Sequence, residues 1–179
     1  MDIQAKIENG IIFSEYSPDL VAIFRSKGGK WDAAEKGWRF SPEQGAAVFE
    51  KLFGSGDIVT VRVPRCKTSE EADGYGMVGG YLLAFRKGRD YPARMAPGVE
   101  LISGSFSSSC GSRNHPGLGD SEDTVYRLQV YRSFAEREGL EIEEQGEPAR
   151  TPVENSALSS VPDAELIAEL TRRGYTINK

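Results

Sequence analysis

The sequence predicts an α+β fold: a small ββαβ-type unit, then a mainly antiparallel sheet with long loops, then a tethered C-terminal helix. In the first third, two Ser-Pro pairs precede segments with helical apolar spacing, and short apolar strands lie around them. Alternating apolar segments follow, and a polar Pro/Ser-rich stretch precedes a last amphipathic segment. We therefore divide the chain into 1–66, 67–142, a disordered linker over 143–160 and a short helix within 161–179.

Two helices are predicted in the first segment, and each begins at a Ser-Pro pair. Ser17 is a good helix cap, Pro18 suits the first helical position, and the glycines at 28–29 end the helix. Ser41 and Pro42 start the second helix in the same way. We expect the apolar face of this second helix to comprise Ala46, Val48, Phe49 and Leu52.

Short strands accompany these helices. Asn9-Gly10 predicts a turn between two short strands, and the segment KWDAAEKGWRF predicts a second pair around a turn at 34–37. The alternating segment 58–63, IVTVRV, predicts a further strand.

The second segment predicts an antiparallel sheet of three or four strands. Its strands lie in 78–86, 99–106 and 124–134, and 134–141 predicts a short closing helix. If 78–86 and 99–106 are hairpin neighbours, the basic turn at 86–94 lies at the opposite end of the pair from the loop at 107–122, which makes two contact surfaces. Loops as long as 65–77 and 107–122 are uncommon in compact domains and are often functional.

Composition limits the class of protein. The chain has 179 residues, 39% hydrophobic and 27% charged, which is typical of a globular protein. No run approaches the ~20 apolar residues of a membrane span, and the N-terminus lacks the basic start and apolar segment of a signal peptide. We expect a cytoplasmic protein that does not contact a membrane.

Metal and cofactor chemistry have little support. Cys66, Cys110 and His115 are the only cysteines and the only histidine, too few for the four ligands of a structural zinc site. No Asp-x-Asp or calcium-loop spacing occurs. We expect no metal site and no cofactor.

The net charge of −5 is unevenly distributed. Residues 1–66 hold nine basic and nine acidic side chains, residues 67–135 hold eight of each, and residues 136–179 hold five basic against ten acidic. The body of the protein is therefore neutral, and a focused basic site for a polyanion is allowed.

Residues 11–53, IIFSEYSPDLVAIFRSKGGKWDAAEKGWRFSPEQGAAVFEKLF, resemble the HARP-like module attached to annealing helicases and related helicase-like proteins. The shared pattern is an apolar strand, a Pro-Asp-Leu-Val helix, Gly-Lys-Trp-Asp, a Lys-Gly-Trp-x-Phe strand and a closing helix that ends in Phe. The resemblance implies engagement of branched or single-stranded DNA. No helicase motor follows, so it implies a free-standing accessory protein of a phage or other mobile element.

Five residues carry over from this resemblance to a DNA-facing or core-facing surface: Lys30, Trp31, Lys36, Trp38 and Arg39. Cations interleaved with aromatic rings suit single-stranded nucleic acid, because the cations meet phosphates while the rings stack on bases. The alternative is that the two tryptophans form the core of a very small unit.

The stretch GSFSSSCGSRNHPGLG at 104–119 admits three interpretations. Its glycines and the side chains of Ser112, Arg113, Asn114 and His115 would suit an anion, although no nucleotide-hydrolysis motif is present. Cys110 and His115, oriented by Asp120 or Asp123, would suit covalent catalysis, but no nucleophile motif surrounds the cysteine. A plain connector is the third interpretation.

Two further basic segments could cooperate with this loop. The turn RKGRDYPAR provides Arg86, Lys87, Arg89 and Arg94, with Tyr91 for stacking. Arg127 begins just after the loop on a strand whose Tyr126, Leu128 and Val130 share one face, and we expect it to join the loop.

These observations favour a non-enzymatic accessory protein that binds nucleic acid, or a nucleotide, through Arg, Lys and Trp side chains and the Ser/Gly loop. The alternative is a phage anti-defence protein that sequesters a nucleotide signal or blocks a host protein through its C-terminal helix. An enzyme is the disfavoured third class, and the sequence does not indicate the oligomeric state.

Overall fold

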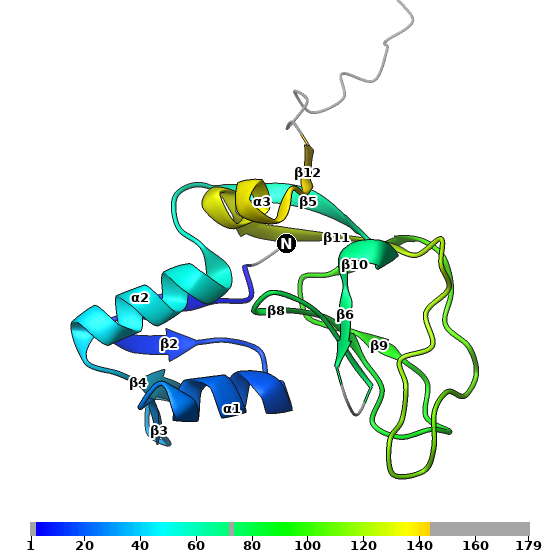
Figure 1. The fold of residues 1–179 in the computed structure, drawn as a ribbon, viewed down its shortest axis with the longest axis horizontal. Coiled ribbons are helices and arrows are strands. Elements are labelled where there is room, and N and C mark those ends of the chain that lie inside the picture. The colour runs from blue at the N-terminus through cyan, green and yellow to red at the C-terminus, as the bar shows by residue number, and fades with distance from the viewer. Residues whose placement is uncertain (1–2, 72–73, 144–179) are drawn as a thin grey trace, which may run out of the picture. The chain divides into compact units, whose positions relative to one another are not determined.

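The structure is a computed structural model that describes residues 3–71 and 74–143 (Figure 1). Its first part is a repeated hairpin-helix arrangement. The four strands form an antiparallel sheet in the order β1-β2-β4-β3. In chain order, the elements are β1 (Lys6–Glu8), β2 (Ile11–Phe13), α1 (Pro18–Ser26), β3 (Lys30–Asp32), β4 (Gly37–Arg39) and α2 (Pro42–Phe53).

The predicted turn between the first two strands is confirmed. Asn9 and Gly10 have φ values of 51° and 75°, the left-handed conformation that a two-residue hairpin turn requires at both central positions. The predicted pair around 34–37 is also present, as β3 and β4.

Both predicted helices are present, and their caps differ. The Ser17 side chain accepts a hydrogen bond from the Leu20 backbone N–H at 3.1 Å in a buried position. Ser41 begins α2 without a side-chain hydrogen bond to the backbone. The α2 face was predicted incorrectly at Ala46, which is exposed, because the helix packs through Phe49 and Phe53.

The next strand, β5 (Ile58–Pro64), pairs with strands from the end of the described chain. Sheet order is β10-β11-β5-β12, and all pairs are antiparallel. The predicted alternation of buried and partly exposed residues along β11 is confirmed. The direct partners of β5 are β11 (Val125–Tyr131) and β12 (Glu141–Glu143), and β10 (Glu100–Ser103) pairs with β11. The helix α3 (Arg132–Glu138) follows β11 as predicted.

A third antiparallel sheet has the order β6-β7-β8-β9, so the prediction of a single sheet in the second segment is wrong. The expected hairpin of 78–86 with 99–106 is also wrong, because β8 pairs with β7 and β9 while β10 pairs with β11. Gly79 and Gly80 form a turn that ends β7 and starts β8. The elements are η1 (Arg65–Lys67), β6 (Ser69–Glu71), β7 (Tyr75–Val78), β8 (Tyr81–Phe85) and β9 (Arg94–Met95).

Tyr81 connects its own strand, β8, with α2, α3 and β11 in one core. Its buried ring contacts Phe53 of α2 and Phe134 of α3, with centroids 5.4 and 4.9 Å away. Its hydroxyl donates to the Phe53 carbonyl at 2.9 Å and accepts from the Tyr131 N–H at 3.2 Å. Burial raises the pKa of this phenol, so it stays protonated and able to donate.

The predicted α+β class is confirmed, with helices and antiparallel sheets in the same unit. No helix among residues 3–71 and 74–143 is long and apolar enough to span a membrane. The predicted linker at 143–160, apart from Glu143, and the predicted helix at 161–179 lie outside the described residues.

The two serine caps provide a matched test of the α1 boundary. We expect Ser17→Ala to lower the free energy of unfolding by about 1 kcal/mol, because it removes the only side-chain acceptor of the Leu20 N–H. Ser41→Ala should change it by less than about 0.5 kcal/mol, because it removes no cap bond. Urea denaturation measures both values, and equal losses would contradict the assignment of Ser17 as the side-chain cap of α1.

Candidate anion-binding surface

Arg86, at the end of β8, is the most deeply buried charged residue on this side of the protein, with no exposed surface. Its guanidinium donates to the carbonyl oxygens of Ser107 at 2.6 Å, Tyr91 at 2.6 Å, Leu118 at 3.0 Å and Ser108 at 3.1 Å. A contact with the Arg89 carbonyl is longer, at 3.5 Å. We call this set the Arg86 network.

The Arg86 network changes the role expected for this residue. Arg86 was predicted to bind a ligand, but its N–H groups are directed to backbone carbonyls and none is left for a phosphate. Among the described residues, none of its hydrogen-bond partners is a carboxylate. Within that part of the chain, the positive charge is therefore solvated by carbonyl dipoles and not paired with an acid.

The 107–119 loop is an ordered hairpin. Gly111 and Pro116 form an isolated antiparallel bridge, and the Gly117 N–H donates to the Cys110 carbonyl at 3.0 Å. At the tip, the Ser112 N–H donates to the His115 carbonyl at 2.8 Å and the Ser112 hydroxyl accepts from the His115 N–H at 3.0 Å. These bonds leave Arg113 and Asn114 at the exposed end of the hairpin.

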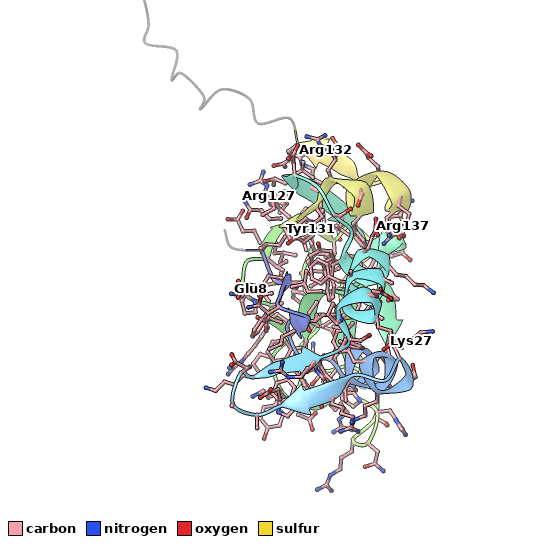
Figure 2. The ribbon with its side chains drawn as sticks, turned by 90° about the vertical axis from the view of Figure 1, so that its left-hand side faces the viewer. Glu8, Lys27, Arg127, Tyr131, Arg132 and Arg137 are labelled. Atoms are coloured by element: carbon pink, nitrogen blue, oxygen red, sulfur yellow. The ribbon has the colours of Figure 1, made fainter. Side chains whose placement is uncertain are left out.

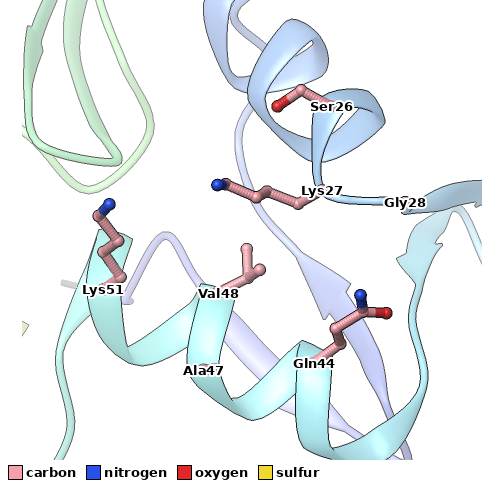
Figure 3. Close-up of a pocket in the computed structure, with 7 residues that line it drawn as sticks. All are labelled: Ser26, Lys27, Gly28, Gln44, Ala47, Val48 and Lys51. Carbon is pink, nitrogen blue, oxygen red and sulfur yellow. The ribbon is translucent and has the colours of Figure 1, made fainter.

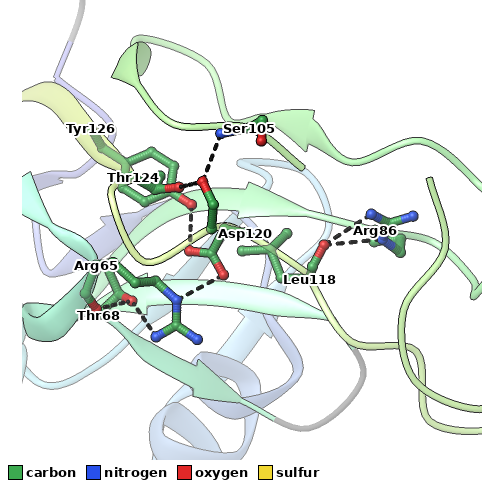
Figure 4. Close-up of polar contacts among 9 residues, drawn as sticks. Arg65, Thr68, Arg86, Ser105, Leu118, Asp120, Thr124 and Tyr126 are labelled. Carbon is green, nitrogen blue, oxygen red and sulfur yellow. Dashed lines mark hydrogen bonds and ion pairs between the residues drawn. The ribbon is translucent and has the colours of Figure 1, made fainter. Parts of the chain in front are cut away.

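A second polar cluster holds the base of the same hairpin (Figure 4). The buried Asp120 carboxylate accepts from Arg65 Nε at 2.8 Å and from the Tyr126 hydroxyl at 2.9 Å. The Ser121 hydroxyl accepts from the Ser105 N–H at 2.9 Å and lies 3.2 Å from the Thr124 hydroxyl. Asp120 thereby connects the base of the hairpin to η1 and to β11.

The basic turn and the 107–119 loop meet, so the expectation of two opposite surfaces is wrong. Arg86 bonds to carbonyls in both segments. They enclose a pocket of about 330 Å³, which we call the basic pocket. It is lined by Pro18, Tyr75, Arg86, Lys87, Arg113, Asn114 and Pro116.

Two exposed cations of the basic pocket have no acidic partner within the described part of the chain. Lys87 and Arg113 make no ion pair there. Arg89, also predicted as a binding residue, differs because it pairs with Asp90 at 2.9 Å. The pocket therefore combines two uncompensated cations with the amide of Asn114, above the buried charge of Arg86.

A smaller pocket of about 200 Å³ adjoins the basic pocket through Lys87. We call it the Tyr91 pocket, and it is lined by Phe85, Lys87, Tyr91, Pro92 and Arg94. The Tyr91 ring is 63% exposed. Arg94 is exposed and makes no ion pair with any described residue.

The residues implied by the resemblance are divided between core and surface. Trp38 is buried, with 7% exposure, and is unavailable to a ligand, whereas Trp31 is 54% exposed and rests edge-on against it at 5.6 Å. Lys30 and Lys36 are exposed on the same hairpin. Arg39 pairs with Asp32 at 2.7 Å, and this guanidinium lowers the pKa of the Asp32 carboxyl.

Arg127 does not join the loop as predicted. It lies between Glu143 at 3.0 Å and Glu100 at 3.3 Å on the sheet that contains β11. Hydrogen bonds from Arg62 and Arg127 lower the pKa of the Glu143 carboxyl. Figure 2 shows Arg127 at the α3 end of the described part, near Arg132 and Tyr131.

Sequence reasoning missed a groove of about 580 Å³ between α1 and α2. Lys27 and Lys51 approach it from opposite sides, with Val48 between them (Figure 3). Gln44 and Ser26 add polar groups to its wall. No local pattern identifies this groove, because it is lined by residues of two helices that the β3–β4 hairpin separates in sequence.

The described residues contain no group of three or more His, Cys, Asp or Glu side chains arranged to hold a metal ion. No family model matches the chain, and no curated protein or solved structure is significantly similar to it. Function is therefore argued from the geometry of the site.

The Arg86 network makes a strong stability prediction. We expect Arg86→Met to lower the free energy of unfolding by about 3 kcal/mol or more, because it leaves the buried Leu118 carbonyl and the partly buried carbonyls of Tyr91, Ser107 and Ser108 without these donors. Arg89→Ala removes an exposed arginine three residues away and should cost less than about 0.5 kcal/mol. Urea denaturation gives both values.

Hydrogen exchange separates a local effect from a global one. In Arg86→Met, the Ser107 and Gly117 amides, which bond across the hairpin, should exchange faster relative to the β5 and β11 amides. Unchanged protection of these two amides would show that the network does not order the loop.

Proposed function

We propose that the protein is a non-enzymatic nucleic-acid-binding accessory protein whose phosphate contacts are centred on the basic pocket. One observation carries the proposal: Lys87 and Arg113 line a single pocket without an acidic partner among the described residues. Asn114 adds an amide donor at the same place. Phosphate oxygens are the acceptors that such donors suit best, because guanidinium and ammonium groups form charge-assisted hydrogen bonds with them.

The buried charge of Arg86 supports an anionic ligand. Water screens a surface cation, but a guanidinium with no exposed surface acts through a medium of lower effective dielectric constant. Since its partners are carbonyl dipoles, the field of this charge reaches the pocket that it lines. A positive field here would also raise the rate at which a polyanion associates.

Further cations and rings lie beyond the basic pocket and favour a polymer over a single anion. The Tyr91 pocket shares Lys87 and adds Arg94 with an exposed ring. Trp31, Lys30 and Lys36 offer a second combination of ring and cations on the β3–β4 hairpin. The resemblance of residues 11–53 to a DNA-engaging module agrees with this proposal, as does an origin in a phage or other mobile element.

Capture of a small nucleotide is the second candidate function. The basic pocket, at about 330 Å³, falls within the range of ~300–1,000 Å³ typical of small-molecule sites. Such a ligand would make few phosphate contacts, so its affinity would depend only weakly on salt. A blocker that acts through the C-terminal helix would use residues outside those described.

The double variant Lys87→Ala/Arg113→Ala tests the phosphate contacts. We expect it to weaken binding of a short DNA oligonucleotide by about tenfold or more at low salt. The slope of log K against log salt concentration should become shallower by about 0.7 to 0.9 for each phosphate that the variant no longer neutralises. Fluorescence anisotropy over a salt series measures both quantities.

Arg132→Ala is the matched control, because Arg132 is an exposed arginine of α3 that makes no ion pair with any described residue. It should leave affinity and slope unchanged. Equal affinities for wild type and the double variant would refute the proposal. A wild-type preference for nucleoside triphosphate over oligonucleotide, with little salt dependence, would favour the nucleotide-capture alternative.

A further inference from the structure

Sheet β6-β7-β8-β9 carries an aromatic row on one of its faces. Tyr75 of β7 and Phe85 of β8 are register partners, and their rings stack with centroids 6.2 Å apart at an interplanar angle of 18°. Tyr16, 65% exposed, meets Tyr75 edge-on at 6.4 Å. The neighbouring strands β7 and β8 thus place two rings side by side, and Tyr16, from the segment between β2 and α1, adds a third.

Cations border this row. Arg94 of β9 is the register partner of Phe85, and Lys87 follows Phe85 by two residues. Phe85 and Lys87 line the same pocket, whereas the Arg86 guanidinium is directed to the 107–119 loop. Tyr91 lies beside these cations, because it lines one pocket together with Phe85, Lys87 and Arg94.

The opposite face is already covered. The 107–119 loop packs there, since a Cβ on Gly76 would lie 2.6 Å from a Leu118 methyl group and Arg86 bonds to the Leu118 carbonyl. The loop therefore does not cover the face of the sheet that carries Tyr75 and Phe85. At the end of the strands, Arg113 and Asn114 reach the pocket that Tyr75 also lines.

We propose that a single-stranded nucleic acid lies across this face, with bases stacked on Tyr91 and Tyr16 at the two ends of the row and phosphates held by Lys87, Arg94 and Arg113. This inference rests on the proposed function and names its substrate class. Base faces are accessible only in an unpaired strand, because in a duplex they are stacked on one another and only their edges are exposed in the grooves. Exposed rings among cations that make no ion pair with any described residue therefore suit an unpaired strand and not a duplex.

The experiment uses the full chain and three probes. The first is an oligothymidine of about 16 nucleotides, at the upper end of single-strand site sizes. The second is a hairpin duplex with the same number of phosphates. The third is an abasic oligomer of the same length, which keeps the phosphates and lacks every base. Fluorescence anisotropy at one low salt concentration gives the three affinities.

We expect wild type to bind oligothymidine more tightly than the other two probes. Tyr91→Ala should weaken oligothymidine binding by about tenfold, because one base loses its stacking partner, and change duplex and abasic binding by less than about twofold. The Arg86 network stays intact in this variant, because Arg86 uses only the Tyr91 backbone carbonyl. Tyr91→Phe should restore the affinity, and Tyr16→Ala should repeat the effect at the other end of the row.

Arg132→Ala and Ile58→Ala are controls, since both replace exposed side chains of the α3 and β5 region. Equal affinity for all three probes, or unchanged oligothymidine binding in both tyrosine variants, would overturn the single-strand inference and leave the proposed function standing. Absence of binding to all three probes would overturn both.

Discussion

The burial of one positive charge governs the arrangement of the whole candidate site. Removing a guanidinium from water is costly, and here dipoles from two separate segments offset that cost in place of a carboxylate. Tyr91 belongs to the turn after β8, and Ser107 and Leu118 belong to the two arms of the hairpin. The chain must therefore bring both segments to the end of β8, and their tips enclose the basic pocket as a result.

Side chains of a β-strand alternate between the two faces of its sheet, so residues at the end of β8 contact both faces. Arg86 points toward the 107–119 loop and orders it, while Phe85 and Lys87 point to the face that the loop leaves open. A one-residue shift in register would exchange these roles and expose the guanidinium. The pairing of Phe85 with both Tyr75 and Arg94 fixes that register, so ring stacking and loop order depend on the same strand alignment.

Local signals predicted the helices and the β1–β2 and β3–β4 hairpins, because caps and turns depend on a few adjacent residues. Ser17 and Asn9-Gly10 act as their sequence suggests. The partition into three sheets was not predictable in the same way, since an alternating strand does not specify its partner. The burial of Arg86 was even harder to predict from the sequence. Nothing in RKGR distinguishes the arginine that folds inward from its exposed neighbours, because its acceptors in Ser107, Ser108 and Leu118 lie more than twenty residues away. The two tryptophans divide likewise. They are register partners, but Trp38 lies on the internal strand β4 and packs on Phe24, whereas Trp31 on the edge strand β3 is exposed.

The serine-rich composition of the loop has a structural explanation, which sharpens the assignment of its binding residues. Ser107 donates to the Ser109 carbonyl at 3.0 Å, and the Ser112 hydroxyl accepts from the His115 N–H. Together with the bonds of Ser121 at the base, these hydroxyls satisfy the backbone of a hairpin that has few apolar contacts of its own. Serines that hold the backbone need no ligand to account for them. The side chains of Arg113 and Asn114 do not hold the hairpin backbone in this way. Both line the pocket that also contains Lys87. The loop is thus an ordered hairpin that presents two exposed side chains, and the proposed anion contacts depend on those two together with Lys87.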